Sequence, residues 1–215
     1  MIFLTDKLIF PPVTLADENG LLAVGGDLSP ERLLLAYKSG IFPWFNPGEP
    51  IIWYSPDLRM VLYPSQLKVS KSMRKILDKG DFKVTFNQNF KQVIANCKNI
   101  KRKDALGTWI TDEMEQAYIK LHNLGIAKSV EVWQNNELVG GLYGIDLGTV
   151  FCGESMFSKR SNASKIAFYY LVQKLESKHY KLIDCQVYNP FLASLGAVEI
   201  PRDVFMELLD FKDKK

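Results

Sequence analysis

Two acids and one amide stand where the sequence predicts buried strands. Glu154 follows the apolar run 149–152 and a glycine, while Asp184 and Gln186 lie inside the apolar run 182–187. Burying a carboxyl or an amide costs free energy unless the group is paired. Three such groups at two neighbouring strand ends therefore need a reason, and we interpret them as the marks of an acyl-transfer site.

Other residues able to carry chemistry are scarce or badly placed. The chain has two histidines, neither with a partner ligand at useful spacing, so we expect no metal site and no histidine-based triad. Ser155 lies in GES, not in a GxSxG elbow. Strand alternation points Cys185 away from its two polar neighbours, as a small core residue. There is no P-loop and no GxGxxG after a strand, so nucleotide-driven chemistry has no support.

The patterns around these residues predict the elements that position them. Strands are expected at 83–86, 129–133, 138–145, 149–152 and 182–187, with helices at about 88–97, after Thr111, and after the polar turn 158–162. The strand–helix–strand unit at 149–186 would form one parallel crossover, and the other strands would pair as hairpins. We therefore predict an α+β fold with a mixed, mostly antiparallel sheet and helices on both faces.

Length and composition set the class of protein. A chain of 215 residues, 47% of them hydrophobic, is long and apolar enough for one large domain or one domain plus a small one. The formal charge of +3 means that a polyanion would have to meet a local basic patch. Three widely spaced cysteines indicate reduced thiols, and no apolar run nears the ~20 residues of a membrane helix. We expect a soluble, cytoplasmic protein.

Two further stretches are open to two interpretations each. The segment 41–59 carries four prolines and five aromatic residues, and it is either a small aromatic core under a loop or a stacking wall for a base. A helix at 70–79 gathers basic residues on one side, and 101–103 adds three more. This basic face is either solvated or a contact for RNA phosphates.

The order of strands and helices resembles the acetyltransferase superfamily, which suggests acetyl-CoA as an acyl donor. That superfamily cradles a pyrophosphate with a glycine-containing turn between a strand and the next helix. The corresponding stretch here, 160–165, has no glycine to bring a phosphate close to the backbone. A CoA site is therefore disfavoured, and a related fold with another acyl donor is favoured.

A closer resemblance covers nearly the whole chain. The chain resembles the leucyl/phenylalanyl-tRNA–protein transferase family in an ordered series of motifs: GGDLSPERLL (25–34), GIFPWF (40–45), SPDLR (55–59), GTWI (107–110), SVEVW (129–133), LVGGLYG (138–144), FCGESMFS (151–158), NASK (162–165), LIDCQV (182–187) and SLGA (194–197). Histidines common before SVE and SLGA in the family are Lys128 and Phe191 here. Without them, a histidine base is not expected.

The resemblance implies the reaction. Leucine or phenylalanine, and methionine less well, would pass from tRNA to the α-amine of proteins that begin with arginine or lysine, which marks them for the N-degron pathway. The partners would be leucyl-tRNA, phenylalanyl-tRNA and those acceptor proteins. The donor ester is already activated, so no cofactor and no metal is expected. The resemblance also implies an acetyltransferase-like catalytic domain at 62–215 behind a small α/β domain at 1–61, and we expect a monomer.

The resemblance also assigns roles to residues of this chain. Asp184 would accept or orient the amine proton, with Gln186 as its relay, and Glu154 would hold the acceptor's basic first side chain or share the amine. A structural acid pair, satisfied by backbone or by Lys165, is the alternative. The aminoacyl pocket would be apolar, made of Leu142, Met156, Phe168, Leu171, Leu175 and Ile183 with Tyr118 at the wall. The terminal adenosine would lie on Trp44 and Trp109, and the acceptor stem on Lys71, Arg74, Lys75 and Lys79.

Two other functions remain open at this point. One is an acetyltransferase that uses acetyl-CoA, and the other is a tRNA-binding module without catalytic activity. The preference between leucine and phenylalanine is also open.

Overall fold

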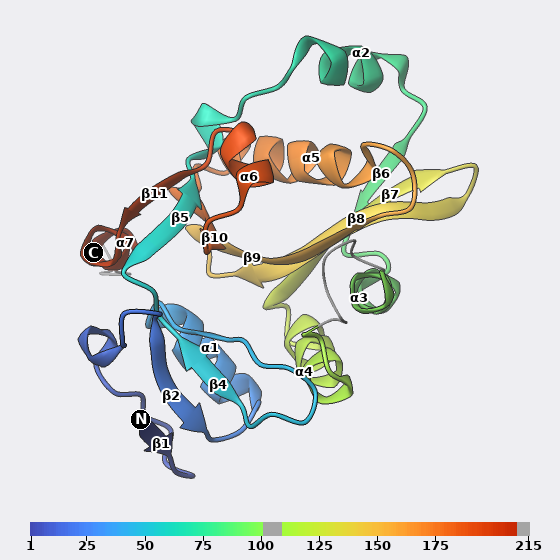
Figure 1. Cartoon of the computed structure of the whole chain (residues 1–215). Helices are drawn as coiled ribbons and strands as arrows, with labels where there is room; N and C mark the ends of the chain where they lie inside the picture. The colour runs from blue at the N-terminus through green and yellow to red at the C-terminus, as the bar shows by residue number, and fades with distance from the viewer. Residues whose placement is uncertain (101–108, 210–215) are drawn as a thin grey trace.

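The computed structural model describes residues 1–100 and 109–209. The basic residues at 101–103, the first two residues of the motif at 107–110 and the C-terminal end from 210 lie outside the described residues. Two β-sheets organise the chain, a four-stranded sheet near the N-terminus and a seven-stranded sheet formed by the rest (Figure 1).

The small sheet has the strand order β1 (Ile2–Leu4), β2 (Leu21–Gly25), β4 (Ile52–Tyr54) and β3 (Phe42–Pro43). The pair β1–β2 is parallel, and the other pairs are antiparallel. Helix α1 (Pro30–Lys38) packs beside it, and its start matches the sequence pattern. The Ser29 hydroxyl accepts a hydrogen bond from the backbone N–H of Arg32, and proline occupies the first position.

The large sheet has the order β11 (Val198–Pro201), β5 (Leu58–Leu62), β10 (Leu182–Gln186), β9 (Val150–Ser158), β8 (Glu137–Asp146), β7 (Ala127–Gln134) and β6 (Lys83–Phe86). Only β9 and β10 pair in parallel, across a crossover through helix α5 (Ala163–Ser177). The predicted mixed, mostly antiparallel sheet with one crossover is therefore confirmed.

Helices cover both faces of the large sheet, as predicted (Figure 1). Helix α5 lies on one face, and α3 (Phe90–Asn99) and α4 (Asp112–Asn123) lie on the other. Helix α2 (Lys71–Lys79) stands at the outer end of the α5 side, and the short helices α6 (Pro190–Ser194) and α7 (Arg202–Leu209) complete the chain near β10 and β11. No helix among the described residues is long and apolar enough to cross a membrane.

Two hydrophobic clusters correspond to the two faces. One lies under α5 and includes Met60, Ile166 and Leu171. The other joins α3 and α4 to the small sheet, since buried Trp53 belongs to the same cluster as Tyr118. The division into residues 1–61 and 62–215 stays a prediction, and strand β5 runs across it.

Candidate active site

Two β-bulges on neighbouring strands place the predicted catalytic side chains. In the β8–β9 pair, Tyr143 faces Ser155 and Gly144 faces Gly153, so Glu154 is an extra residue without a partner on β8. A Cβ atom on Gly144 would lie 2.2 Å from the carbonyl oxygen of Cys152, and only glycine allows this approach. Strand β9 continues through Gly153, and the bulge turns Glu154 inward.

The second bulge lies on β10. Asp184 faces Val61 and Gln186 faces Met60, which leaves Cys185 as the extra residue, and Gln186 has a φ of 66°. The bulge interrupts the side-chain alternation of the strand. Cys185 therefore lines the same cavity as Gln186, and the prediction that it points away from Gln186 is wrong, although it packs against the apolar cluster under α5.

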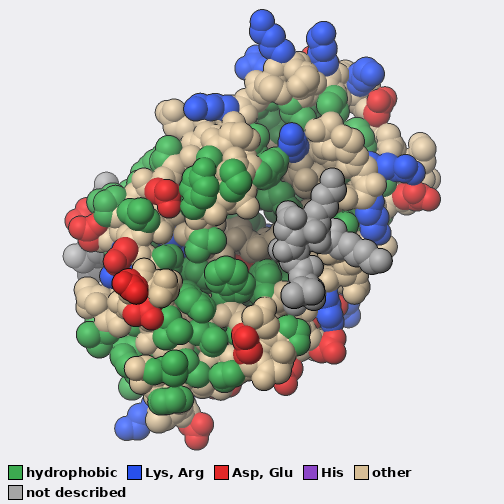
Figure 2. Space-filling model, in the orientation of Figure 1, with side chains coloured by type: hydrophobic (Ala, Val, Ile, Leu, Met, Phe, Trp, Pro, Cys, Tyr) green, Lys and Arg blue, Asp and Glu red, His purple; other side chains and the backbone are tan. Residues whose placement is uncertain are grey.

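A cavity of about 480 Å³ opens beside these bulges. Figure 2 shows the molecule hollowed near the centre of this face, in the region where β9 and β10 run in Figure 1. Its walls come from the β3 segment, β8, β9, α5, β10 and α6. They are largely apolar, and Glu154 and Gln186 are polar groups within them. We refer to this space as the first cavity.

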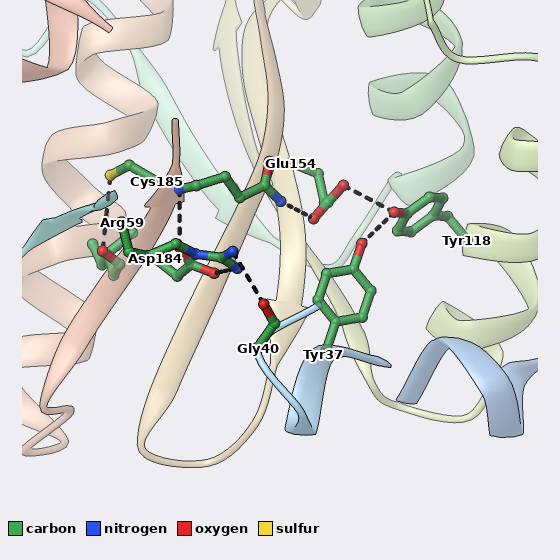
Figure 3. Close-up of polar contacts among 9 residues, drawn as sticks. Tyr37, Gly40, Arg59, Tyr118, Glu154, Asp184 and Cys185 are labelled. Carbon is green, nitrogen blue, oxygen red and sulfur yellow. Dashed lines mark hydrogen bonds and ion pairs between the residues drawn. The ribbon is translucent and has the colours of Figure 1, made fainter. Parts of the chain in front are cut away.

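A hydrogen-bonded chain holds Glu154 at the cavity wall (Figure 3). Its Oε2 accepts from the Tyr118 hydroxyl at 2.9 Å, and its Oε1 accepts from Gln186 Nε2 at 2.8 Å. The Tyr118 hydroxyl also bonds the hydroxyl of Tyr37, a residue of α1. The carboxylate is therefore fixed by groups from three other elements, α4, β10 and, through Tyr118, α1.

Burial controls the protonation of this chain. Burial raises the pKa of Glu154 to about 7, although hydrogen bonds from Tyr37, Tyr118 and Gln186 lower it in part, and the charge of Asp184 adds to the rise. Burial likewise raises the pKa of Tyr37 and of Tyr118 well above the usual value, so both stay protonated donors. Glu154 is thus a carboxyl group that changes its charge near neutral pH.

Asp184 does not line the first cavity. Its side chain is fully buried, and Arg59 of β5 binds both of its oxygens, with Nε–Oδ1 at 2.8 Å and Nη2–Oδ2 at 2.7 Å. Oδ1 also accepts from the backbone N–H of Gln186 at 2.9 Å. The ion-paired Asp184 carboxylate therefore lies outside the lining of the first cavity. Its role, as proton acceptor or as orienting group, stays a prediction.

Arg59 itself is held on every side. Its Nη1 donates to the carbonyl of Gly40 at 3.2 Å, and its guanidinium carbon lies 4.7 Å from the ring centroids of both Phe42 and Phe205. Burial disfavours the charged guanidinium, yet the Asp184 carboxylate raises the pKa of Arg59. Lys165, the partner suggested from the sequence, instead lies over the Phe191 ring.

Most of the predicted aminoacyl residues meet at the first cavity. Leu142, Met156, Phe168, Leu171 and Ile183 all line it. Leu175 does not, since it faces a separate small cavity of about 130 Å³ near the end of α5. Tyr118 does not line the first cavity either, because it is fully buried behind Glu154 and bonds its carboxyl group. Both were wrongly placed because helix and strand periodicity does not distinguish a cavity wall from the core behind it.

The predicted nucleic-acid contacts divide between two places. Trp44 and Trp109 both line the first cavity, and Trp44 is 46% exposed. The basic residues of α2 project from the outer end of the molecule, where Figure 2 shows blue side chains gathered. All four are exposed, while Met73 on the opposite side of the helix is buried. Their role in RNA binding stays a prediction.

Arg59 and Tyr37 are site residues that sequence reasoning missed. Arg59 is the lone charge in the apolar strand 58–62, and a buried charge requires an opposite charge nearby. The equally isolated Asp184 was its available partner, 125 residues further along the chain. No local pattern marks Tyr37, which has the appearance of an ordinary inward helix residue.

Comparisons with known proteins point to one family. The chain matches the family model of the leucyl/phenylalanyl-tRNA protein transferase over residues 61–210, and the model of that family's N-terminal domain over residues 26–57. Three relatives carry the name leucyl/phenylalanyl-tRNA–protein transferase. The protein of Flavobacterium johnsoniae is 66% identical over 99% of this chain and 100% of its own length. That of Christiangramia forsetii is 58% identical over 97% and 100%, and that of Syntrophus aciditrophicus is 57% identical over 94% and 84%.

Solved structures that match are far more distant. A GCN5-related N-acetyltransferase from Kribbella flavida is 12% identical with a TM-score of 0.38, and the match covers 79% of this chain and 59% of that chain. The sequence relatives, by contrast, match over nearly their whole lengths. The chain therefore belongs to the leucyl/phenylalanyl-tRNA–protein transferase family of aminoacyltransferases.

Proposed function

We propose that this protein transfers leucine or phenylalanine, and methionine less well, from aminoacyl-tRNA to the α-amine of proteins whose first residue is arginine or lysine. Acceptors modified in this way would enter the N-degron pathway. The observation that carries the proposal is an acid in an otherwise largely apolar cavity: Glu154 faces the space that apolar residues of β8, β9, α5 and β10 enclose. An apolar aminoacyl side chain and a cationic acceptor would both find complementary surfaces there.

The reaction needs little more than placement. The free α-amine attacks the carbonyl carbon of the aminoacyl ester, the new C–N bond forms, and the C–O bond to the ribose breaks. The α-amine has a pKa of about 7.7–8.0, so a substantial fraction is already neutral near pH 7. Holding amine and ester in contact therefore accounts for much of the catalytic demand.

Gln186 is suited to orient the amine. When Glu154 is ionised it can only accept hydrogen bonds, so the amide NH₂ of Gln186 must face it. The contact of 2.8 Å between Gln186 Nε2 and Glu154 Oε1 has this orientation. The amide oxygen then has free acceptor capacity toward the cavity. Asp184 would act through the backbone, since its bond to the Gln186 N–H supports the positive φ that this residue adopts.

Glu154 is suited to hold the basic first side chain of the acceptor. A carboxylate has about four lone-pair sites, and its bonds to Tyr118, Gln186 and Tyr37 leave acceptor capacity for a guanidinium or an ammonium group. A cation at this point would also favour the ionised form of a group whose pKa is otherwise about 7. Binding of the acceptor and ionisation of Glu154 would therefore support each other.

The tRNA would approach across the face that carries these groups. Its terminal adenosine would stack on Trp44 and Trp109 at the cavity, and the basic face of α2 would meet phosphates of the acceptor stem. Such lysine contacts position an RNA without reading its sequence. This arrangement agrees with a donor that is recognised mainly by its aminoacyl end.

The direct test is transfer of radiolabelled leucine from leucyl-tRNA to a short peptide that begins with arginine, beside the N-acetylated form of the same peptide. Transfer to the free peptide alone, and loss of most transfer when the first residue is changed to glutamate, would support the proposal. Absence of transfer from both leucyl- and phenylalanyl-tRNA would overturn it. Thermal stabilisation by CoA, or tRNA binding without any transfer, would then point to the two other functions.

A further inference from the structure

A second cavity of about 370 Å³ lies next to the first. Phe168 lines both, so the two spaces share this ring as a wall. The second cavity is formed by the segment that leads into α2, by the first half of α5 and by the end of α6, with Lys68, Ser70, Met73, Lys165, Phe168 and Tyr169 among its lining residues.

The lining combines rings with positive charge. Tyr169 lines the cavity, is half-buried and lies edge-to-face with Tyr170 at 5.4 Å between ring centroids, and buried Met73 adds an apolar surface. Lys68 and Lys165 supply two positive charges, and neither forms an ion pair among the described residues. An aromatic ring beside lysines without ion pairs suits a nucleotide, since a base stacks on a ring and a phosphate meets lysines.

Backbone contacts fix the cavity in place. The N–H of Lys68 donates to the carbonyl of Leu195 at 2.8 Å, which ties the segment before α2 to the end of α6. Gly196 has a φ of 104°, and a Cβ atom there would lie 2.4 Å from the carbonyl oxygen of Gln66. The glycine of the SLGA motif is thus required for the close approach that closes this side of the cavity.

The cavity stands between two features already assigned to the tRNA. On one side, the Lys165 ammonium lies 5.6 Å from the ring centroid of Phe191, which lines the first cavity. On the other side, Ser70 lines the second cavity and also caps α2 by accepting from the N–H of Met73 at 3.1 Å. The exposed basic residues of α2 begin at the next position, Lys71. The second cavity therefore lies between the first cavity and the basic helix α2.

We propose that the second cavity binds the nucleotide that precedes the terminal adenosine of the donor tRNA. Its base stacks on Tyr169, and Lys165 and Lys68 meet the phosphates on either side. This inference rests on the proposed function, since it requires an aminoacyl-tRNA donor whose adenosine occupies the first cavity. It adds a site that makes donor affinity depend on the length of the 3′ strand.

The test compares donors of increasing length. Leucine would be carried on adenosine alone, on a cytidine–adenosine dinucleotide, and on complete tRNA, and kcat/KM would be measured for each with one arginine-initiated peptide. We expect the wild-type protein to use the dinucleotide better than adenosine. Tyr169→Ala should remove this gain, with a roughly tenfold loss on the dinucleotide, in line with stacking of ~1–3 kcal/mol per base. The same variant should leave the reaction of aminoacyl-adenosine unchanged.

Matched variants separate stacking and charge from structural damage. Tyr169→Phe keeps the ring and should retain the gain, while Lys165→Ala should lose it and Lys165→Arg should keep it. Lys178→Ala removes the lysine directly after the last residue of α5, which does not line the second cavity, and should have no effect.

Equal losses on all three donors, no loss on any, or no wild-type gain from the second nucleotide would overturn the proposal. A rise of the acceptor KM alone would also overturn it, because the cavity would then bind the peptide. The wild-type reaction of aminoacyl-adenosine distinguishes failure of the nucleotide subsite from failure of the proposed function. If it proceeds, the proposed function stands whatever happens to the subsite, and if no donor reacts, both proposals fail.

Discussion

Arg59 and Asp184 form a bidentate ion pair that connects β5 to β10 in the interior of the protein, with both side chains almost completely removed from solvent. Removing one member of such a pair leaves an uncompensated charge, which typically costs about 3–5 kcal/mol. We expect Arg59→Met to lower the free energy of unfolding in urea by about that amount.

The double variant Arg59→Met with Asp184→Leu provides the control, because it removes both charges. It should regain most of the lost stability while transfer activity stays low, since Gln186 has lost the acceptor for its backbone N–H. If the double variant is fully active, Asp184 has no role in placing Gln186.

The hydroxyl of Tyr118 lowers the pKa of Glu154, so its loss should raise that pKa above about 7. We expect Tyr118→Phe to need a higher pH than the wild-type protein for the same fraction of full activity with an arginine-initiated peptide. The pH profile of kcat/KM from pH 6 to 9 measures this shift. Tyr180→Phe removes a comparable hydroxyl, bonded to Asp146 instead, and should leave the profile in place.

The raised pKa of Glu154 also links stability to pH. In the unfolded chain this carboxyl ionises near 4.5, whereas in the folded protein it ionises near 7. Between these values the folded state binds the extra proton, so stability should fall as pH rises, by up to roughly 1.4 kcal/mol per pH unit. Glu154→Gln cannot ionise, and its stability relative to wild type should increase from pH 5 to pH 8 in thermal unfolding. A constant difference would mean that the carboxyl is not shifted.

Leu142 lines the first cavity, and shortening it should favour the larger donor. We expect Leu142→Ala to change the ratio of kcat/KM for phenylalanyl-tRNA to that for leucyl-tRNA by an amount equivalent to ~1–3 kcal/mol. Leu175→Ala is the matched control, because Leu175 is equally buried but does not line the first cavity. It should lower stability and leave the ratio unchanged.

The exposed lysines of α2 should govern the salt dependence of tRNA binding. Each lost phosphate contact reduces the slope of log affinity against log salt by about 0.7–0.9. The variant Lys71→Ala with Lys75→Ala should therefore bind complete tRNA with a smaller slope, and react normally with aminoacyl-adenosine. Replacing two exposed lysines on the other face of the large sheet, Lys91 and Lys120, serves as the control for net charge. An equal change of slope in the control would remove α2 from the tRNA site.

Periodicity predicted the five strands β6 to β10 of the large sheet, because alternation survives wherever the ladder is regular, but β5 and β11 at its other edge were not predicted. The predicted strand 83–86 agrees with β6 to the residue, and the helix expected after Thr111 begins there, with the Thr111 hydroxyl accepting from the backbone N–H of Met114. Local sequence also marked Glu154 and Gln186, as polar groups in apolar runs.

The errors lie where one extra residue or a distant partner decides the geometry. A bulge at Cys185 reverses the alternation on which its predicted orientation depended. The ion pair of Asp184 was not predicted, because its partner, Arg59, belongs to a strand that is remote in sequence and adjacent only in the folded sheet. Neither a bulge nor a long-range ion pair leaves a periodic signal in one sequence.

The position of β5 in the large sheet has a consequence during synthesis of the protein. β5 is made early, yet both of its neighbours, β10 and β11, are among the last strands of the chain. A ribosome must therefore add about 140 residues after Arg59 before the strand that carries it is flanked on both sides. Long-range pairings of this kind form late and slowly. A nascent chain still attached to its ribosome, surrounded by aminoacyl-tRNAs, thus lacks the assembled site until β10 and β11 have been made.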